Sequence, residues 1–193
     1  FCALNNSRGD FLVKQFDMCY AVSCSGLLRK KRSPVECDKR TMTVALGNPR
    51  SKKWSCLPYA EQELMSCKTL IPNLDLRVQG AFTKSSFLKA TAEADYLLLS
   101  THMTEDQDSP LLNRIVLSDD SATGQESFVS CEEICRLDMT GSHVFLNSCS
   151  SACLGGLRGN GLYFSKEVFG FPHAFLIAGA SDVLCALWPI DDR

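Results

Sequence analysis

The chain has 193 residues, of which 45% are hydrophobic and 22% are charged, and its formal net charge is −2. This apolar content is sufficient to build a buried core, which excludes an intrinsically disordered chain. The small net charge argues against direct nucleic-acid binding by the chain as a whole. No apolar run reaches the roughly 18 residues that a membrane-spanning helix needs, so we expect no membrane segment.

The sequence contains 11 cysteines, an odd number, and their spacings do not match the paired C-x-x-C ligands of a zinc ribbon. Several stand inside apolar runs, where a free thiol packs as a small hydrophobe. We therefore expect a reducing, intracellular environment, the cytoplasm, with no disulfide framework, no metal and no cofactor. The chain shows no signal-peptide pattern, and it begins and ends in mid-pattern, which indicates a piece of a longer chain.

Short apolar runs rich in strand-forming residues alternate with segments of helical length. In chain order, strands are predicted at 41–47, 74–80, 95–101, 114–119, 143–149 and 182–189. Helices are predicted at 57–72, 83–94, 130–137 and 161–179, the last of them interrupted near 170–172. Thr83 and Ser130 are N-cap candidates, and Glu133 completes a capping-box pattern with Ser130. The polar residues 118–129 are predicted to form a mobile loop.

Strands that are apolar on both faces and that alternate with helices are typical of a mainly parallel sheet between two helical layers. We therefore predict an α/β fold, a three-layer α/β/α sandwich with a mainly parallel central sheet. The whole chain, 1–193, is predicted to be a single domain. Within it, residues 1–40 are expected to form a peripheral lead-in and residues 41–193 the core.

Reactive side chains of a parallel α/β sheet collect beyond the carboxyl ends of its strands. The strand at 95–101 leads directly to His102, and the strand at 143–149 ends on Cys149. The other two histidines are placed differently, since His143 enters its strand at the amino end and His173 falls in an apolar helical segment. His102 is therefore the histidine that we expect near Cys149.

A cysteine nucleophile needs a base or a cation beside it, because the thiolate is the reactive form. A histidine on the neighbouring strand end would supply that base, and backbone N–H groups of Cys149 and of the turn after His102 would hold the oxyanion. The alternative is that His102 is a satisfied strand-end histidine and Cys149 a buried thiol. Spacing alone leaves both interpretations open.

Three motifs in chain order extend this pattern: Thr101-His102-Met103, Asn147-Ser148-Cys149 and "LWPIDD" at 187–192. Together with the upstream segments "DMCYAVSCSGLLRKKR" and "VALGNP", they resemble the CHAT domain. This is a caspase-like peptidase domain that is often found with tetratricopeptide repeats. The resemblance runs from about residue 10 to residue 193.

The resemblance implies a cysteine endopeptidase fold of the caspase–separase clan, with a protein or peptide as substrate. Cys149 would be the nucleophile and His102 the general base and acid. By similarity to separases, Asp192, with Asp191 beside it, would accept a basic side chain of the substrate at the P1 position. The alternative for these two carboxylates is a solvated turn or a helix cap.

Met103 departs from the family pattern, which has glycine after the histidine. The N–H of that position contributes to the oxyanion hole in the clan, and a methionine keeps this donor. Glycine, however, adopts backbone angles that methionine resists, and the longer side chain would crowd the cleft. A second interpretation is therefore a catalytically weak or inactive CHAT module. Such a module would act as an interaction scaffold with tetratricopeptide repeats in the parent chain or in a complex.

Overall fold

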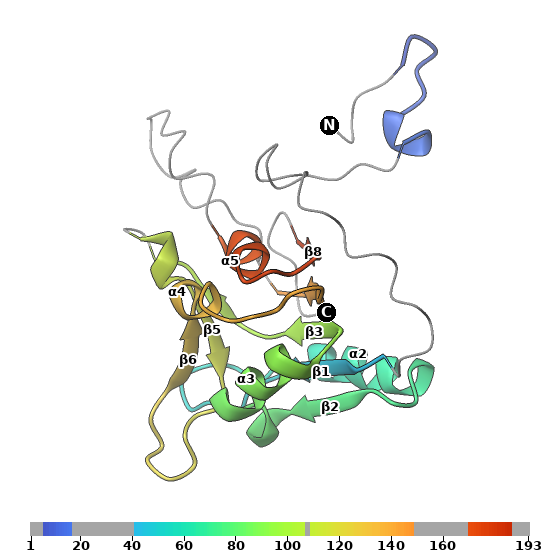
Figure 1. Ribbon diagram of the computed structural model, residues 1–193. Coiled ribbons are helices and arrows are strands. Elements are labelled where there is room, and N and C mark those ends of the chain that lie inside the picture. The colour runs from blue at the N-terminus through green and yellow to red at the C-terminus, as the bar shows by residue number, and fades with distance from the viewer. Residues whose placement is uncertain (1–5, 17–40, 107–108, 149–169, 187–193) are drawn as a thin grey trace. The chain divides into compact units, whose positions relative to one another are not determined.

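The computed structural model describes residues 6–16, 41–106, 109–148 and 170–186 (Figure 1). The chain divides into two compact units, Phe1–Lys31 and Arg32–Arg193. In the first unit, the described residues include one short 3₁₀ helix, η1 (Leu12–Lys14). All other described elements belong to the second unit. The prediction of one domain over 1–193 stays a prediction.

The second unit is built on a parallel sheet of five strands in the order β2-β1-β3-β7-β8. Each pair of neighbours in this sheet runs parallel. The strands are β1 (Thr43–Gly47), β2 (Asp75–Val78), β3 (Tyr96–Ser100), β7 (His143–Leu146) and β8 (Asp182–Cys185). All five fall within segments that the sequence predicts as strands, and the mainly parallel sheet is confirmed.

A second, three-stranded sheet is antiparallel and was not expected from the sequence. It consists of β4 (Met103–Thr104), β5 (Arg114–Leu117) and β6 (Ser127–Ser130). The prediction of a continuous loop over 118–129 is therefore wrong at its end, where β6 begins. The segment 127–130 is short and half polar, and it becomes a strand because β5 supplies its hydrogen-bonding partners.

The helices begin at residues that suit a helix start. They are α2 (Pro58–Leu70), α3 (Lys84–Glu93), α4 (Cys131–Ile134) and α5 (Phe171–Ile177), with 3₁₀ turns η2 (Gln79–Ala81) and η3 (Pro110–Leu112). Proline stands in the first turn of α2 and of α5, where its missing N–H costs no hydrogen bond. Thr83 caps α3, and Ser130 with Glu133 forms the predicted capping box of α4.

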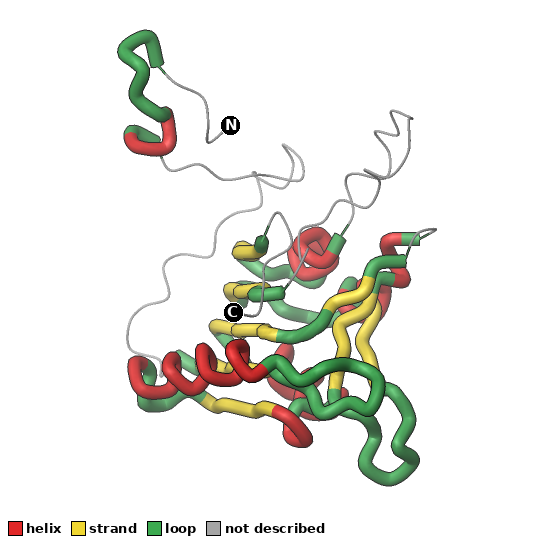
Figure 2. The backbone as a smooth tube through the Cα atoms, turned by 180° about the vertical axis from the view of Figure 1, so that it is seen from behind, coloured by secondary structure: helices red, strands yellow, loops and turns green. Residues whose placement is uncertain are grey.

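The helices cover both faces of the parallel sheet and so give the predicted three layers. On one face, the larger core joins side chains of β1, β3 and β7 to α3, α4 and α5, with Phe87, Phe171 and Phe175 among its fully buried residues. On the other face, Leu64 of α2 packs with Ala45 and Leu74. Seen from behind, α2 lies in front of the strands (Figure 2). The fold class is therefore confirmed.

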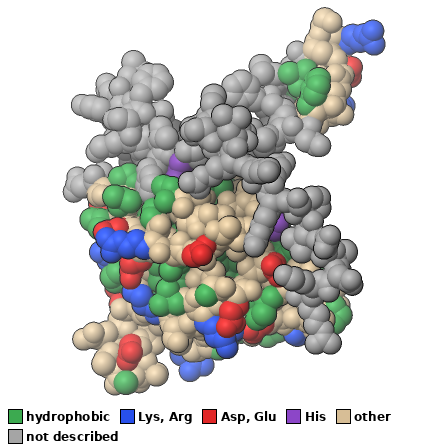
Figure 3. Space-filling model, in the orientation of Figure 1, with side chains coloured by type: hydrophobic (Ala, Val, Ile, Leu, Met, Phe, Trp, Pro, Cys, Tyr) green, Lys and Arg blue, Asp and Glu red, His purple; other side chains and the backbone are tan. Residues whose placement is uncertain are grey.

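Charged side chains of both signs share the surface. On the face shown in Figure 3, Lys and Arg side chains lie beside Asp and Glu side chains. Two ion pairs of this kind are Lys84 with Glu133 at 2.5 Å and Arg136 with Glu132 at 2.5 Å. Within the described ranges, no helix is long and apolar enough to cross a membrane.

Candidate functional site

The carboxyl ends of β3 and β7 stay side by side beyond their last paired residues. The two strands pair from Tyr96 with His143 to Leu99 with Leu146. The ladder then continues, because the N–H of Asn147 donates to the Leu99 carbonyl at 2.8 Å. The next contact between the two strand ends is made by the side chain of Ser148.

The Ser148 hydroxyl accepts a hydrogen bond from the N–H of Thr101, with 3.3 Å between the two atoms. Both residues are buried, at 3% exposed for Thr101 and 4% for Ser148. The Thr101 hydroxyl in turn donates to the carbonyl of Val116 in β5 at 2.8 Å. The two strand ends are therefore held together up to the residues that precede His102 and Cys149.

His102 is partly exposed and has two neighbours on the loop that follows β1, residues 49–57. Its Nε2 atom lies 2.8 Å from the carbonyl oxygen of Ser55. A carbonyl oxygen only accepts hydrogen bonds, so Nε2 carries a hydrogen. In the neutral ring the second nitrogen, Nδ1, is then unprotonated and can act as a base. The Trp54 ring packs against the imidazole, with 5.3 Å between ring centroids and 35° between planes.

Residues 52–54, in the middle of the loop 49–57, contact residues 118–126. The indole N–H of Trp54 donates to Glu126 at 2.8 Å, and the Lys53 ammonium lies 3.2 Å from the other oxygen of the same carboxylate. The bond from Trp54, helped by Lys53, lowers the pKa of Glu126 from its usual value. The backbone N–H of Lys52 also donates to Asp119, at 2.8 Å. The position of Trp54 over His102 therefore depends on this second loop.

Met103 lies in β4, directly after His102. The N–H of Val116 donates to the His102 carbonyl at 3.0 Å, and Met103 is paired with Ile115. In an antiparallel ladder, bonds that flank a pair leave its own N–H groups pointing away from the partner strand. The Met103 N–H therefore points away from β5. The Met103 side chain is partly buried and packs against the larger core.

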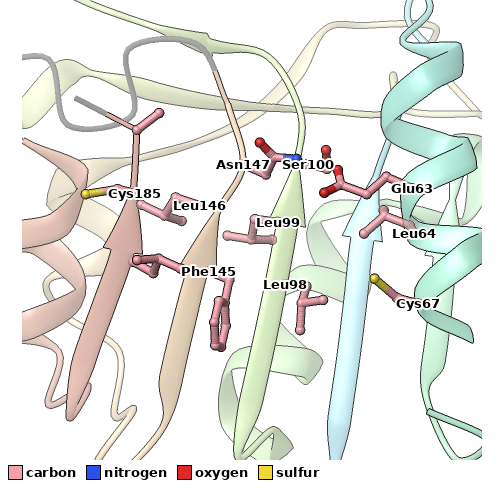
Figure 4. Close-up of a pocket in the computed structure, with 12 residues that line it drawn as sticks. Glu63, Leu64, Cys67, Leu98, Leu99, Ser100, Phe145, Leu146, Asn147 and Cys185 are labelled. Atoms are coloured by element: carbon pink, nitrogen blue, oxygen red, sulfur yellow. Dashed lines mark hydrogen bonds between the residues drawn. The ribbon is translucent and has the colours of Figure 1, made fainter. Parts of the chain in front are cut away.

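An apolar groove of about 320 Å³ runs along β3 and β7 on the face that α2 covers in part. Figure 4 shows Leu98, Phe145 and Cys67 along its length and Ser100, Asn147 and Glu63 at the carboxyl ends of the strands. The Asn147 amide donates to the Glu63 carboxylate, which ties β7 to α2 at that end. The groove therefore ends two residues before His102 on one strand.

Three of the predicted site residues, Cys149, Asp191 and Asp192, lie outside the described residues. His102 and Met103 are described, and the structure adds two residues that the sequence analysis missed, Trp54 and Ser55. Nothing in the local pattern of "SKKWSC" indicates contact with a histidine 47 residues further along the chain. Among the described residues, no group of three or more His, Cys, Asp or Glu side chains is arranged to hold a metal ion.

The sequence model of the CHAT domain family matches residues 1–193. The chain belongs to the CHAT domain family. This confirms the resemblance seen in the sequence, and it places the domain in the caspase-like peptidase clan. The parallel sheet between helical layers is consistent with that fold.

Two curated proteins are similar to the CHAT domain described here. Tetratricopeptide repeat protein 28 of Mus musculus is 22% identical over 191 residues, which cover 83% of this chain and 8% of that protein. Tetratricopeptide repeat protein 28 of Homo sapiens is 23% identical over an alignment of 222 residues. That alignment covers 96% of this chain and 9% of that protein. The chain therefore spans less than a tenth of the length of these relatives.

Proposed function

We propose that this CHAT domain is a cysteine endopeptidase in which Cys149 is the nucleophile and His102 moves the protons. The observation that carries the proposal is the hydrogen bond between Thr101 and Ser148, the residues directly before the proposed pair. His102 is the third residue after Leu99 and Cys149 the third after Leu146, and these two leucines are partners in the β3–β7 register. Family membership supports the same pair.

The state of His102 suits the role of a base. Its Nε2–H is occupied by the Ser55 carbonyl, so the proton from the thiol would go to Nδ1. A neutral imidazole with one nitrogen fixed in this way is also fixed in orientation, which is the usual function of a third group behind a nucleophile–base pair. The packed Trp54 ring restricts the imidazole further.

The chemistry follows the scheme of a thiol peptidase. Cys149 gives its proton to His102 Nδ1, and the sulfur forms a bond with the scissile carbonyl carbon. The oxyanion that results would accept hydrogen bonds from the N–H groups of Met103 and Cys149. His102 then protonates the leaving amine as the C–N bond breaks, which leaves a thioester on Cys149. A water molecule, deprotonated by His102, attacks the thioester and releases the carboxylate product and the thiol.

We assign the substrate preference to Asp191 and Asp192, which would pair with an arginine or lysine side chain at P1. Both residues come from the separase-like pattern in the sequence. A carboxylate and a guanidinium form two parallel hydrogen bonds, so arginine would be preferred to lysine. Protein or peptide chains with a basic residue at the cleavage point are the proposed substrate class.

The test is covalent labelling with a peptide that ends in arginine and carries a thiol-reactive group. We expect one labelled cysteine, Cys149, by peptide mass mapping, and loss of labelling in His102→Gln. Burial raises the pKa of Cys131 to about 12 and also raises the pKa of Cys135 and Cys185, so these thiols should stay unlabelled. Labelling that is spread over exposed cysteines such as Cys56, and that persists in His102→Gln, would refute the proposal.

A scaffold role is the second candidate, and the names of the two similar proteins favour it. Both are tetratricopeptide repeat proteins, so a repeat array in the parent chain or in a complex is a reasonable partner. The replacement of the family glycine by Met103 points the same way. In this case Cys149→Ala would leave binding of a tetratricopeptide repeat array unchanged, and no peptide would be cleaved by the unaltered chain.

A further inference from the structure

Asn48 has an unusual backbone at the point where the chain leaves the parallel sheet. It follows β1 directly, is 1% exposed and has a φ of +43°. Asparagine tolerates this left-handed region better than most residues other than glycine. The chain turns at Asn48 and begins the loop 49–57, which carries both Trp54 and Ser55 to His102.

The backbone of Asn48 connects three elements. Its N–H donates to the carbonyl of Ser100 at 3.0 Å, and its own carbonyl accepts from the N–H of Gln79 at 2.9 Å. Ser100 is the last residue of β3 and stands two residues before His102. Asn48 therefore contacts the strand end that leads to the histidine.

The side chain of Asn48, at the start of the loop 49–57, holds the end of that loop and the first turns of α2. Its Oδ1 accepts from the N–H of Leu57 at 2.8 Å, and its Nδ2 donates to Glu61 of α2 at 2.5 Å. The same Nδ2 lies 3.4 Å from the Cys56 sulfur. Gln79 also donates to this Glu61 oxygen, at 2.8 Å, so the carboxylate joins two amides. Both polar atoms of the buried Asn48 side chain are thus engaged.

The Ser55 carbonyl lies between the two attachments of the loop. The first part of the loop is held by residues 118–126, through Lys52 and Trp54. The last part is held by Asn48 through Leu57, two residues after Ser55. Ser55 itself is exposed, and its carbonyl is the partner of His102 Nε2. The place of this carbonyl therefore depends on the Asn48 amide.

We propose that Asn48 is a positioning residue for His102. Its side chain fixes the Ser55 carbonyl, this carbonyl keeps the hydrogen of the imidazole on Nε2, and Nδ1 stays unprotonated and able to take the thiol proton. The proposal rests on the proposed peptidase function for its chemical meaning. Asn48 touches neither the substrate nor the reacting atoms, so it acts through Ser55 and His102.

The first test uses Asn48→Gly in the 193-residue chain. Glycine accepts the positive φ, so the backbone turn is kept and only the side-chain bonds are lost. The readout is the His102 side chain in a nitrogen NMR spectrum of ¹⁵N-histidine-labelled protein, assigned with His102→Gln. We expect a slowly exchanging Nε2–H signal in the unaltered chain. In Asn48→Gly the signal should be lost by exchange with water, and the rate of Cys149 alkylation should fall about tenfold to a hundredfold.

A double variant keeps the test specific. In Asn48→Asp a carboxylate faces Glu61, and we expect the same defect as in Asn48→Gly. Adding Glu61→Gln reverses donor and acceptor, because the new Gln amide donates to the new Asp carboxylate and net charge is unchanged. This pair should restore the Nε2–H signal and most of the alkylation rate. Ser142→Ala is the matched control, since its buried hydroxyl donates to Ala94 at the amino end of the sheet.

Two results would overturn the inference. One is an Nε2–H signal in Asn48→Gly that exchanges as slowly as in the unaltered chain. The other is an Asn48→Asp/Glu61→Gln pair that stays as defective as Asn48→Gly. Failure of the peptidase proposal looks different, because alkylation of Cys149 would then be the same in His102→Gln as in the unaltered chain. The NMR signal would still report whether Asn48 controls the His102 ring.

Discussion

The Ser148 hydroxyl accepts a hydrogen bond from the backbone N–H of Thr101, across 3.3 Å and 47 residues of chain. Each of these residues precedes one member of the proposed catalytic pair. The bond extends the β3–β7 contact past the last paired residues by means of a side chain. It therefore limits how far the ends of β3 and β7 can move apart.

Ser148→Ala removes the hydroxyl that accepts this hydrogen bond, so the buried Thr101 N–H loses its partner. We expect the free energy of unfolding to fall by about 1–3 kcal/mol, the usual cost of an unsatisfied buried group. Urea unfolding followed by circular dichroism measures the loss. The rate of Cys149 alkylation should fall in the same variant. An alkylation rate equal to that of Ser142→Ala, at equal stability, would contradict a role for the bond in holding the strand ends.

Gly47 is the last residue of β1, and the space beside it is closed. A Cβ atom there would lie 2.5 Å from the Ser100 carbonyl oxygen and 2.5 Å from a methyl carbon of Leu64. The leucine can rotate, but the carbonyl belongs to the β1–β3 ladder. We expect Gly47→Ala to destabilise the fold by about 1–3 kcal/mol, as overpacking does. Thermal unfolding measures this, and a midpoint equal to that of the unaltered chain would show that the strand ends are less tightly packed.

Trp54 offers an optical signal of its packing against His102. The two rings are 5.3 Å apart, so the imidazole covers part of the indole. The chain has two tryptophans, and Trp188→Phe leaves Trp54 as the single emitter. Because loss of the imidazole leaves more of the indole in contact with water, we expect the emission maximum to shift to longer wavelength in His102→Ala in this background.

The control is Ser142→Ala in the Trp188→Phe background, in which the emission maximum should stay unchanged. Glu126→Gln is a second check, because it weakens the bond to the indole N–H that holds Trp54 in place. A shift of the emission maximum to longer wavelength is expected there as well. An emission maximum that stays unchanged in both His102→Ala and Glu126→Gln would contradict the packing of Trp54 against His102.

His173 in α5 gives the fold a dependence on pH. Burial lowers the pKa of His173 from its usual value of 6.5. Between that value and the lower pKa of the folded state, the unfolded chain binds more protons than the folded chain. Stability is therefore fully present above pH 6.5 and is lost as pH falls through this window. Urea midpoints at pH 7.5 and pH 5.5 should differ more in the unaltered chain than in His173→Gln, and equal differences would refute the assignment.

Local sequence patterns were sufficient to predict the helices and the parallel strands. The Ser130–Glu133 capping box was predicted and is present, because its bonds join residues three apart. The strands of the parallel sheet were recognised because they are buried on both faces and so read as continuous apolar runs. Chain order also indicated that His102 and Cys149 each follow a strand, since strand ends are local features.

Tertiary structure alone decided which loops meet His102 and which strand completes the second sheet. The Ser55 carbonyl and the Trp54 ring lie 47 and 48 positions before the histidine, and Glu126 reaches Trp54 across 72 residues. Such contacts depend on where folded strands place their connecting loops, and no periodicity of a single segment encodes that. Strand β6 shows the same limit, because its hydrogen-bonding partner β5 makes a strand of four residues whose own sequence is equally compatible with a loop.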